Sequence, residues 1–189
     1  WAQVSPATTP TANDHYKAQY DAARGVTVLV GENDTTYELE TWEFDGTDWA
    51  QAFPATVPPL RSKFATAYDA ARGSVILFGG YDLTGIYFPV QDTWEYDGTT
   101  WRELLTADVP TARERHAIAY DMARGKIVLF GGMTDTGMVN DTWLLGYHGP
   151  WAPEICAPAT DVDGDGKSYC EDADCQWLPS CVRCGNQSC

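Results

Sequence analysis

Small and apolar residues follow one another along this chain in short runs, and the same four runs recur three times. The first run, FATAYD or HAIAYD, alternates such residues and ends at an aspartate. An Arg-Gly turn then leads into a β-branched run, SVILFGG or KIVLFGG, which the neighbouring glycines end. The third run, DTWEYDG, ends in an Asp-Gly turn, and a tryptophan begins the fourth run. Four short strands joined by turns predict one antiparallel sheet per repeat and an all-β fold.

This four-run pattern has a period of about fifty residues. YDAARGVTVLVGE begins at Tyr20, YDAARGSVILFGG at Tyr68 and YDMARGKIVLFGG at Tyr120. The tryptophans that begin the fourth runs are Trp1, Trp49, Trp101 and Trp151. Repeats of this length that each form one sheet bury their faces by stacking radially, so the pattern predicts propeller blades with the repeated aromatic residues between them.

The Gly-Gly pair that ends a hydrophobic strand, with an aromatic residue and then a tryptophan beyond it, resembles the kelch repeat over residues 1–151. The resemblance implies a β-propeller, usually of six or seven blades; most such proteins are binding platforms and a minority are enzymes. We expect three four-stranded blades at 1–49, 50–101 and 102–151, with Trp1 in the last strand of a preceding blade. Three blades do not close a ring. Closure needs either upstream blades in the same chain or a second copy that completes a six-bladed ring.

The chain departs from its own repeat at a few positions. Gly31-Glu32 replaces the Gly-Gly pair of the first repeat, and Asn13 stands where Arg61 and Arg113 stand. Each Arg-Gly turn has the same arginine and, three residues before it, the same aspartate. This recurrence indicates structural roles in the turns and between blades. The residues are Asp21, Asp69, Asp121, Arg24, Arg72 and Arg124.

The charge balance excludes two classes of partner. The formal net charge is −15, from 27 acidic and 12 basic residues. A chain this acidic is repelled by phosphate backbones and by anionic lipid, so we expect no nucleic-acid binding. No stretch is apolar enough to span a bilayer, so we also expect no membrane insertion.

All six cysteines lie near the C-terminus, which marks residues 152–189 as a separate tail; they are Cys156, Cys170, Cys175, Cys181, Cys184 and Cys189. An even count in a short loop-rich segment favours three disulfides in an oxidising compartment, with the pairing open. We therefore expect a secreted or cell-surface protein. The alternative is a zinc site, because Cys181 and Cys184 have ligand spacing.

The tail also carries the pattern of a calcium loop, DVDGDGKSYCED. Aspartates at alternate positions suit a hard cation such as Ca²⁺, and a glycine at the sixth position permits the sharp bend. The predicted ligands are Asp161, Asp163, Asp165, Lys167 through its carbonyl, Asp172 and, as a possible extra ligand, Asp174. The segment resembles thrombospondin type 3 repeats and similar tails of secreted bacterial surface proteins, which implies that calcium and cystines substitute there for a hydrophobic core.

The repeats differ most after the Gly-Gly position, in NDTTYEL, YDLTGIYFPVQ and MTDTGMVN. Variable loops on a repeated scaffold are where ligand contacts normally lie. The longest of them supplies Tyr81, Tyr87 and Phe88 as candidate ligand-binding residues for a protein or carbohydrate partner; the alternative is that these aromatics pack on a neighbouring blade. Asn33, Asn140 and Asn186 begin glycosylation triplets, whose use the sequence leaves open.

These features together predict an extracellular recognition or structural module with no catalytic residues in this chain. Two alternatives stay open. One is an extracellular propeller enzyme, a hydrolase or oxidase, whose active residues lie on blades absent here. The other is a self-assembling surface or filament protein.

Overall fold

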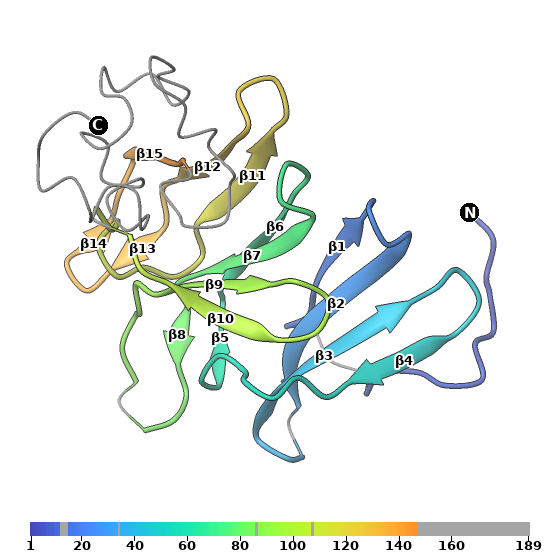
Figure 1. The fold of residues 1–189 in the computed structure, drawn as a ribbon. Helices are drawn as coiled ribbons and strands as arrows, with labels where there is room; N and C mark the ends of the chain where they lie inside the picture. The colour runs from blue at the N-terminus through green and yellow to red at the C-terminus, as the bar shows by residue number, and fades with distance from the viewer. Residues whose placement is uncertain (12–14, 34, 86, 107, 147–189) are drawn as a thin grey trace, which may run out of the picture. The chain divides into compact units, whose positions relative to one another are not determined.

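The computed structural model describes residues 1–11, 15–33, 35–85, 87–106 and 108–146. The chain divides into two compact units, Trp1–Leu145 and Gly146–Cys189, of which the first is described below. Its regular structure consists of strands, as the repeated runs predict (Figure 1). Over these residues, no helix has the length and apolar character needed to cross a membrane.

The strands form three main antiparallel sheets, one for each repeat. Sheet 1 runs in the order β1 (Lys17–Asp21), β2 (Val26–Asn33), β3 (Glu38–Phe44), β4 (Trp49–Ala52). Sheet 2 runs in the order β6 (Ala65–Asp69), β7 (Ser74–Phe78), β9 (Thr93–Tyr96), β10 (Trp101–Leu104). Sheet 3 contains β11 (Ala117–Asp121), β12 (Lys126–Phe130) and β15 (Thr142–Leu145). This architecture is β-propeller-like and confirms the predicted all-β class.

Two small pairings join the connections between these strands. β5 (Arg61–Ser62) pairs with β8 (Tyr81–Asp82), and β13 (Met133–Thr134) pairs with β14 (Gly137–Met138). The strand expected at Trp1 is not formed. Residues 1–11 carry no strand, and the Trp1 indole is exposed. Such a strand is normally held by the third strand of its own blade, as β4 is held by β3.

The turn between the first and second strands has the same cause in every sheet. In sheet 2, the Asp69 carboxylate accepts the N–H groups of Ala71 and Arg72 at 3.0 and 3.3 Å. Gly73 then adopts a φ of 70°, a conformation that favours glycine. The recurring Asp-x-x-Arg-Gly sequence therefore acts as a turn in which the aspartate satisfies backbone donors.

The hydrophobic core lies between neighbouring sheets. Trp101 is only 1% exposed; its ring stacks on Tyr96, and its Nε1–H donates to Thr41 Oγ1 of sheet 1 at 3.0 Å. At the other edge of the sheets, away from β4 and β10, the first strands lie next to each other. There the Gln19 side-chain amide donates to the Thr66 carbonyl at 2.9 Å. The blades therefore pack face to face around the line of β1, β6 and β11.

Candidate functional site

The long connections of the three sheets gather at one end of the described unit. Those that follow β2, β7 and β12 lie opposite the short turns that follow β1, β6 and β11 (Figure 1). The connections after β4 and β10 reach the same end, because β5 pairs with β8 and Glu114 forms an isolated bridge with Met133. We call these five connections the loop face.

Two buried arginines hold the loop face to the sheets. Arg61 is 2% exposed and Arg113 is fully buried. Arg61 donates to both carboxylate oxygens of Asp92, and also to the carbonyls of Pro59 and Gly79. A planar guanidinium that meets a carboxylate through two parallel bonds fixes both orientation and distance. The pair therefore ties the connection after β4 to the start of β9.

Sheet 3 repeats this arrangement. Arg113 donates to the two oxygens of Asp141 at 2.6 and 2.8 Å. The same carboxylate accepts the Trp143 Nε1–H at 2.7 Å. These hydrogen bonds from Arg113 and Trp143 hold the pKa of Asp141 well below its ordinary value. The sequence pattern Arg…Asp-Thr-Trp is thus one three-residue unit, which our reading of the sequence missed although both parts recur in register.

Sheet 1 has different residues at the positions of this Arg–Asp–Trp unit. Glu40 stands at the aspartate position and accepts the Trp42 Nε1–H at 3.0 Å. The side-chain amides of Asn33 and Gln51 donate to it at 2.6 and 3.1 Å, and the Tyr16 hydroxyl donates at 3.3 Å. The tryptophan bond is kept, and three neutral donors take the place of the guanidinium. Asn33 is buried in this contact, so its amide is a poor acceptor for a glycan in the folded protein, whereas Asn140 is exposed.

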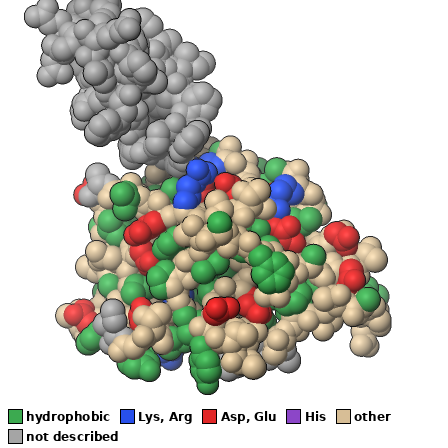
Figure 2. Space-filling view, turned by 60° about the horizontal axis from the view of Figure 1, so that its bottom comes forward, with side chains coloured by type: hydrophobic (Ala, Val, Ile, Leu, Met, Phe, Trp, Pro, Cys, Tyr) green, Lys and Arg blue, Asp and Glu red, His purple; other side chains and the backbone are tan. Residues whose placement is uncertain are grey.

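Large apolar side chains project from the loop face into solvent. The exposed ones on its connections are Tyr37, Phe53, Tyr87, Phe88, Leu105, Val57, Val109 and Met138. Figure 2 shows hydrophobic side chains interspersed with acidic ones over this face, with the basic side chains gathered near one margin. Of the residues predicted to bind a ligand, the structure places Tyr87 and Phe88 in solvent. Tyr81 is half-buried in β8, with the Lys63 Nζ 4.4 Å from its ring centroid.

The backbone holds two of these aromatics in an uncommon conformation. Tyr37 and Tyr87 both have a φ of 56°, in the left-handed region that bulky residues rarely enter. Such strain persists only where surrounding contacts determine it, and it concentrates at binding sites. Tyr37, Phe53 and Met138 lie in loop-face segments in which the sequence predicted no ligand-binding residue. The signal that could have found them is the presence of an apolar residue in a segment that varies between repeats.

A groove of about 430 Å³ runs beside Tyr37 on sheet 1. Tyr37 and Phe53 line it together with the proline-rich connection that follows β4, and Glu40 and Gln51 contribute polar atoms. The Glu40 carboxylate already accepts four hydrogen bonds, so the groove offers mainly apolar walls to a ligand.

A second and wider hollow follows the first strands. It measures about 590 Å³ and is lined from β1, β6 and β11, with Lys17, Lys63 and Arg115 among its residues. The Lys63 Nζ lies 2.9 Å from the buried carboxylate of Glu114, so this cation is already paired. His116 also lines the hollow. Burial, followed by the nearby charge of Arg113, lowers the pKa of His116 to about 4, which makes the imidazole neutral at pH 7.

We expect His116→Phe to stabilise the protein in mild acid. A histidine whose pKa is lowered in the folded state makes the protein less stable as the pH falls from the unfolded pKa of about 6.5 towards the folded pKa. The wild type should therefore lose on the order of 2 kcal/mol more than the variant between those two pH values. Phe64 occupies the matching position of sheet 2 and is buried, so phenylalanine fits the repeat. Urea unfolding at both pH values measures the difference, and equal pH dependence in the two proteins would contradict it.

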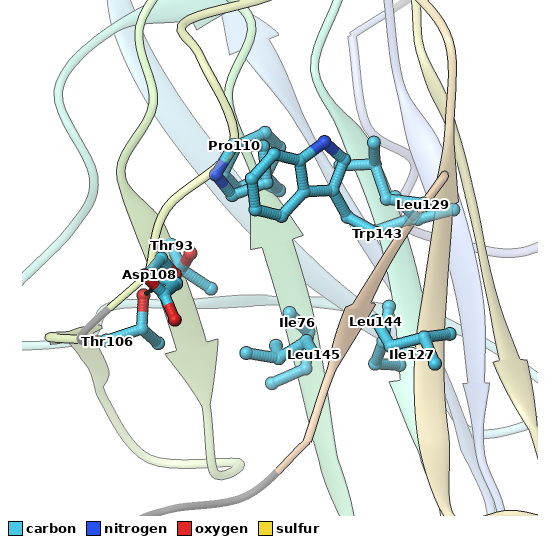
Figure 3. Close-up of a pocket in the computed structure, with 12 residues that line it drawn as sticks. Ile76, Thr93, Thr106, Asp108, Pro110, Ile127, Leu129, Trp143, Leu144 and Leu145 are labelled. Atoms are coloured by element: carbon cyan, nitrogen blue, oxygen red, sulfur yellow. Dashed lines mark hydrogen bonds between the residues drawn. The ribbon is translucent and has the colours of Figure 1, made fainter. Parts of the chain in front are cut away.

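A small apolar pocket of about 80 Å³ separates sheet 2 from sheet 3. Ile76 borders it from sheet 2, while Ile127, Trp143 and Leu145 border it from sheet 3 (Figure 3). The matching space between sheets 1 and 2 is filled by Trp101. We therefore assign this pocket to the interblade core. The counterpart of Trp101 in the repeat, Trp151, lies outside the described residues.

The predicted calcium ligands and cysteines of the tail, from Cys156 to Cys189, also lie outside the described residues. Among the residues that are described, no group of three or more histidines, cysteines, aspartates or glutamates is arranged to hold a metal ion. The calcium site and the disulfides stay predictions from the sequence.

Comparison with known proteins agrees with the fold. No family model matches the chain. The structure of YjhT, a kelch-like β-propeller, superimposes with a TM-score of 0.54 at 16% identity, covering 70% of this chain and 42% of that one. At this identity the likeness concerns the fold alone.

Two curated proteins share short segments with this chain. The dynein alpha chain of the flagellar outer arm of Chlamydomonas reinhardtii is 42% identical over 57 residues, which is 30% of this chain and 1% of that protein. The tRNA wybutosine-synthesizing protein 4 of Emericella nidulans is 34% identical over 61 residues, 30% of this chain and 6% of that protein. The chain thus spans only a small share of the relatives that it matches.

Proposed function

We propose that this protein is a kelch-type recognition module that binds a protein or carbohydrate partner through its loop face. The observation that carries the proposal is the set of exposed aromatic side chains on connections that differ between repeats, headed by Tyr37, Tyr87 and Phe88. Aromatic side chains have only two rotatable bonds, so they supply a large contact area with little loss of side-chain entropy.

The rest of the molecule supports this assignment by exclusion. The polar groups that recur between repeats are engaged within the scaffold: Asp69 and its counterparts in their turns, and the Arg61–Asp92 pair of sheet 2 and its counterpart in sheet 3 with each other. What varies from repeat to repeat is presented at the loop face. This division between a constant scaffold and variable loops is the arrangement by which repeat proteins acquire binding specificity.

We further propose a role outside the cell, with the tail stabilised by Ca²⁺ and three disulfides. The support is the spacing of the aspartates from Asp161 to Asp172 and the confinement of all six cysteines to residues 156–189. The acidic surface of the protein also suits a partner that is neutral or basic.

A binding screen tests the recognition role. The full chain is applied to a printed glycan array and to a phage-displayed peptide library, and each ligand found is then measured with the variants Tyr37→Ala, Tyr87→Ala and Phe88→Ala. We expect at least one of the three to weaken binding by about 10-fold or more, since buried aromatic anchors dominate interfaces. All three side chains are exposed, so the fold should persist.

Met122→Ala is the matched control. Met122 is a large exposed apolar residue in the turn after β11, at the end opposite the loop face. Its loss should leave binding unchanged. A ligand that tolerates all three loop-face substitutions but not Met122→Ala would show that recognition takes place at the other end of the sheets.

A further inference from the structure

Sheets 1 and 3 each carry one face that no other described sheet covers. The free face of sheet 3 is mainly apolar: Phe130 and Leu144 are 55% and 59% exposed, and they share their side with the exposed Ala117 and Ala119. Lys126 lies on the same side at the turn end of β12. We call it the receiving face. The free face of sheet 1, the inserting face, presents Tyr20, Thr27, Phe44 and Trp49 in one row across the strands.

The junction between sheets 1 and 2 shows how two such faces meet. Trp101 of sheet 2 donates to Thr41 of sheet 1, and Tyr68 of sheet 2 accepts the N–H of Ala23 at 3.1 Å. In repeat register, Trp101 and Tyr68 correspond to Trp49 and Tyr20 on the inserting face. Thr41 and Ala23 correspond to Thr142 and Ala123 on sheet 3. The receiving face of sheet 3 therefore carries a matching contact residue for each of these two inserting residues.

Two positions distinguish the free faces from the junction between sheets 1 and 2. Within the chain, the Tyr96 hydroxyl donates to the Glu43 carboxylate across sheets 1 and 2 at 3.0 Å. Leu144 stands in place of Glu43 on the receiving face, and Phe44 stands in place of Tyr96 on the inserting face. Both polar partners of the pair are thus replaced by apolar ones. At the junction of sheets 2 and 3, Leu145 stands in place of Tyr96, and the buried Glu95 carboxylate accepts its bonds from Ser74 and Arg102 of its own sheet. A buried glutamate without such donors needs its partner across the junction.

The arginine of the turn has a matching space as well. Arg24 lies over the Tyr96 ring at 5.6 Å, and a Cβ added at Gly98 would come within 2.7 Å of its guanidinium carbon. The counterpart of Gly98 on sheet 1 is Gly46, where an added Cβ would meet nothing within 4 Å. The counterpart of Arg24 on sheet 3 is Arg124, whose side chain is 71% exposed. Phe44 and Gly46 therefore leave open the space in which Arg124 would lie over a ring.

We propose that the receiving face of one copy packs against the inserting face of a second copy, and the reverse, so that two chains close a ring of six sheets. The occupant is a second copy because Leu144 and Phe44 are complementary to each other, whereas a blade with tyrosine at the Phe44 position would bury its hydroxyl against leucine. Two copies have two such junctions related by a two-fold axis, and a repeated head-to-tail contact that did not close would give a filament.

Sedimentation equilibrium of the full chain over a range of concentrations tests the ring. We expect a dimer in the wild type and about a 100-fold weaker dissociation constant in both Leu144→Glu and Phe130→Glu, because each places a charge in an apolar junction. Leu105→Glu is the matched control, since Leu105 is exposed on the connection after β10 and lies on neither face. Circular dichroism checks that each variant folds.

A second substitution separates this contact from a general effect of charge. Phe44→Tyr in the Leu144→Glu background re-creates the Glu–Tyr pair of the internal junction, so it should recover about 10-fold of the lost affinity. The same change in the Phe130→Glu background should recover nothing. A wild type that stays monomeric at the highest soluble concentration, a filament, or a dimer that tolerates Leu144→Glu would each overturn the proposal.

Discussion

Replacing Arg61 with methionine should lower the free energy of unfolding by about 3 kcal/mol at pH 7. Arg61 is 2% exposed, and its guanidinium is shared between the Asp92 carboxylate and two backbone carbonyls. Methionine fills much of the volume but donates no hydrogen bond. Asp92 would keep its bond from Trp94 but lose both bonds from Arg61, and the carbonyls of Pro59 and Gly79 would lose a donor.

The effect of Arg61→Met should shrink in acid. Burial alone would raise the pKa of Asp92, but the hydrogen bonds and charge of Arg61, together with the bond from Trp94, bring it below the ordinary value. A carboxyl with a depressed pKa in the folded state contributes stability above its unfolded pKa of about 4, and that stability is lost as the pH falls through the folded pKa. The wild type and the variant should therefore converge below about pH 4.

Urea unfolding at pH 7 and at pH 3 measures both parts of this prediction. Arg124→Met is the control, because the Arg124 side chain is 71% exposed and its pair with Asp121 lies in the surface turn after β11. An exposed pair of this kind contributes about 0–1 kcal/mol. If the two substitutions lowered the free energy of unfolding equally at pH 7, the buried Arg61–Asp92 pair would contribute no more to stability than an exposed pair.

The strands were predictable from the sequence because each is marked by local chemistry. The Asp-x-x-Arg-Gly turn fixes the hairpin of β6 and β7, and the glycines after Phe78 end β7 where the sequence placed the stop. The Arg61–Asp92 pair was not predicted, because its members are 31 residues apart and meet only after the connection folds back over sheet 2. Recurrence in register was the signal, since Arg113 and Asp141 repeat both residue types.

Exposure within the loops was harder to predict than the strands. Tyr81, Tyr87 and Phe88 belong to one variable segment, yet Tyr81 enters β8 and contacts Lys63 while the other two face solvent. The difference comes from a pairing with β5, which lies on a separate connection. A sequence pattern indicates which segment varies, but the side chains that leave the surface depend on contacts with distant residues.

Trp101→Ala should lower the free energy of unfolding by about 3–5 kcal/mol, the range measured when buried aromatic residues are truncated. The Trp101 side chain lies in the core cluster shared by sheets 1 and 2, which includes Val28, Val75 and Trp94. Its removal opens a cavity at that junction and leaves Thr41 without its indole donor. Native-state hydrogen exchange should show the loss of protection first in β3 and β9, whose residues face this junction, whereas sheet 3 should respond less.

Two smaller substitutions separate the packing of Trp101 from its hydrogen bond. Trp101→Phe keeps an aromatic ring beside Tyr96 but removes the Nε1–H, and Thr41→Val removes the acceptor. Each should lower stability by about 1–2 kcal/mol, and the double variant should lose less than the sum, because the two changes delete the same bond. Strict additivity would show that the bond contributes nothing, and the junction between the blades would then depend on the buried ring alone.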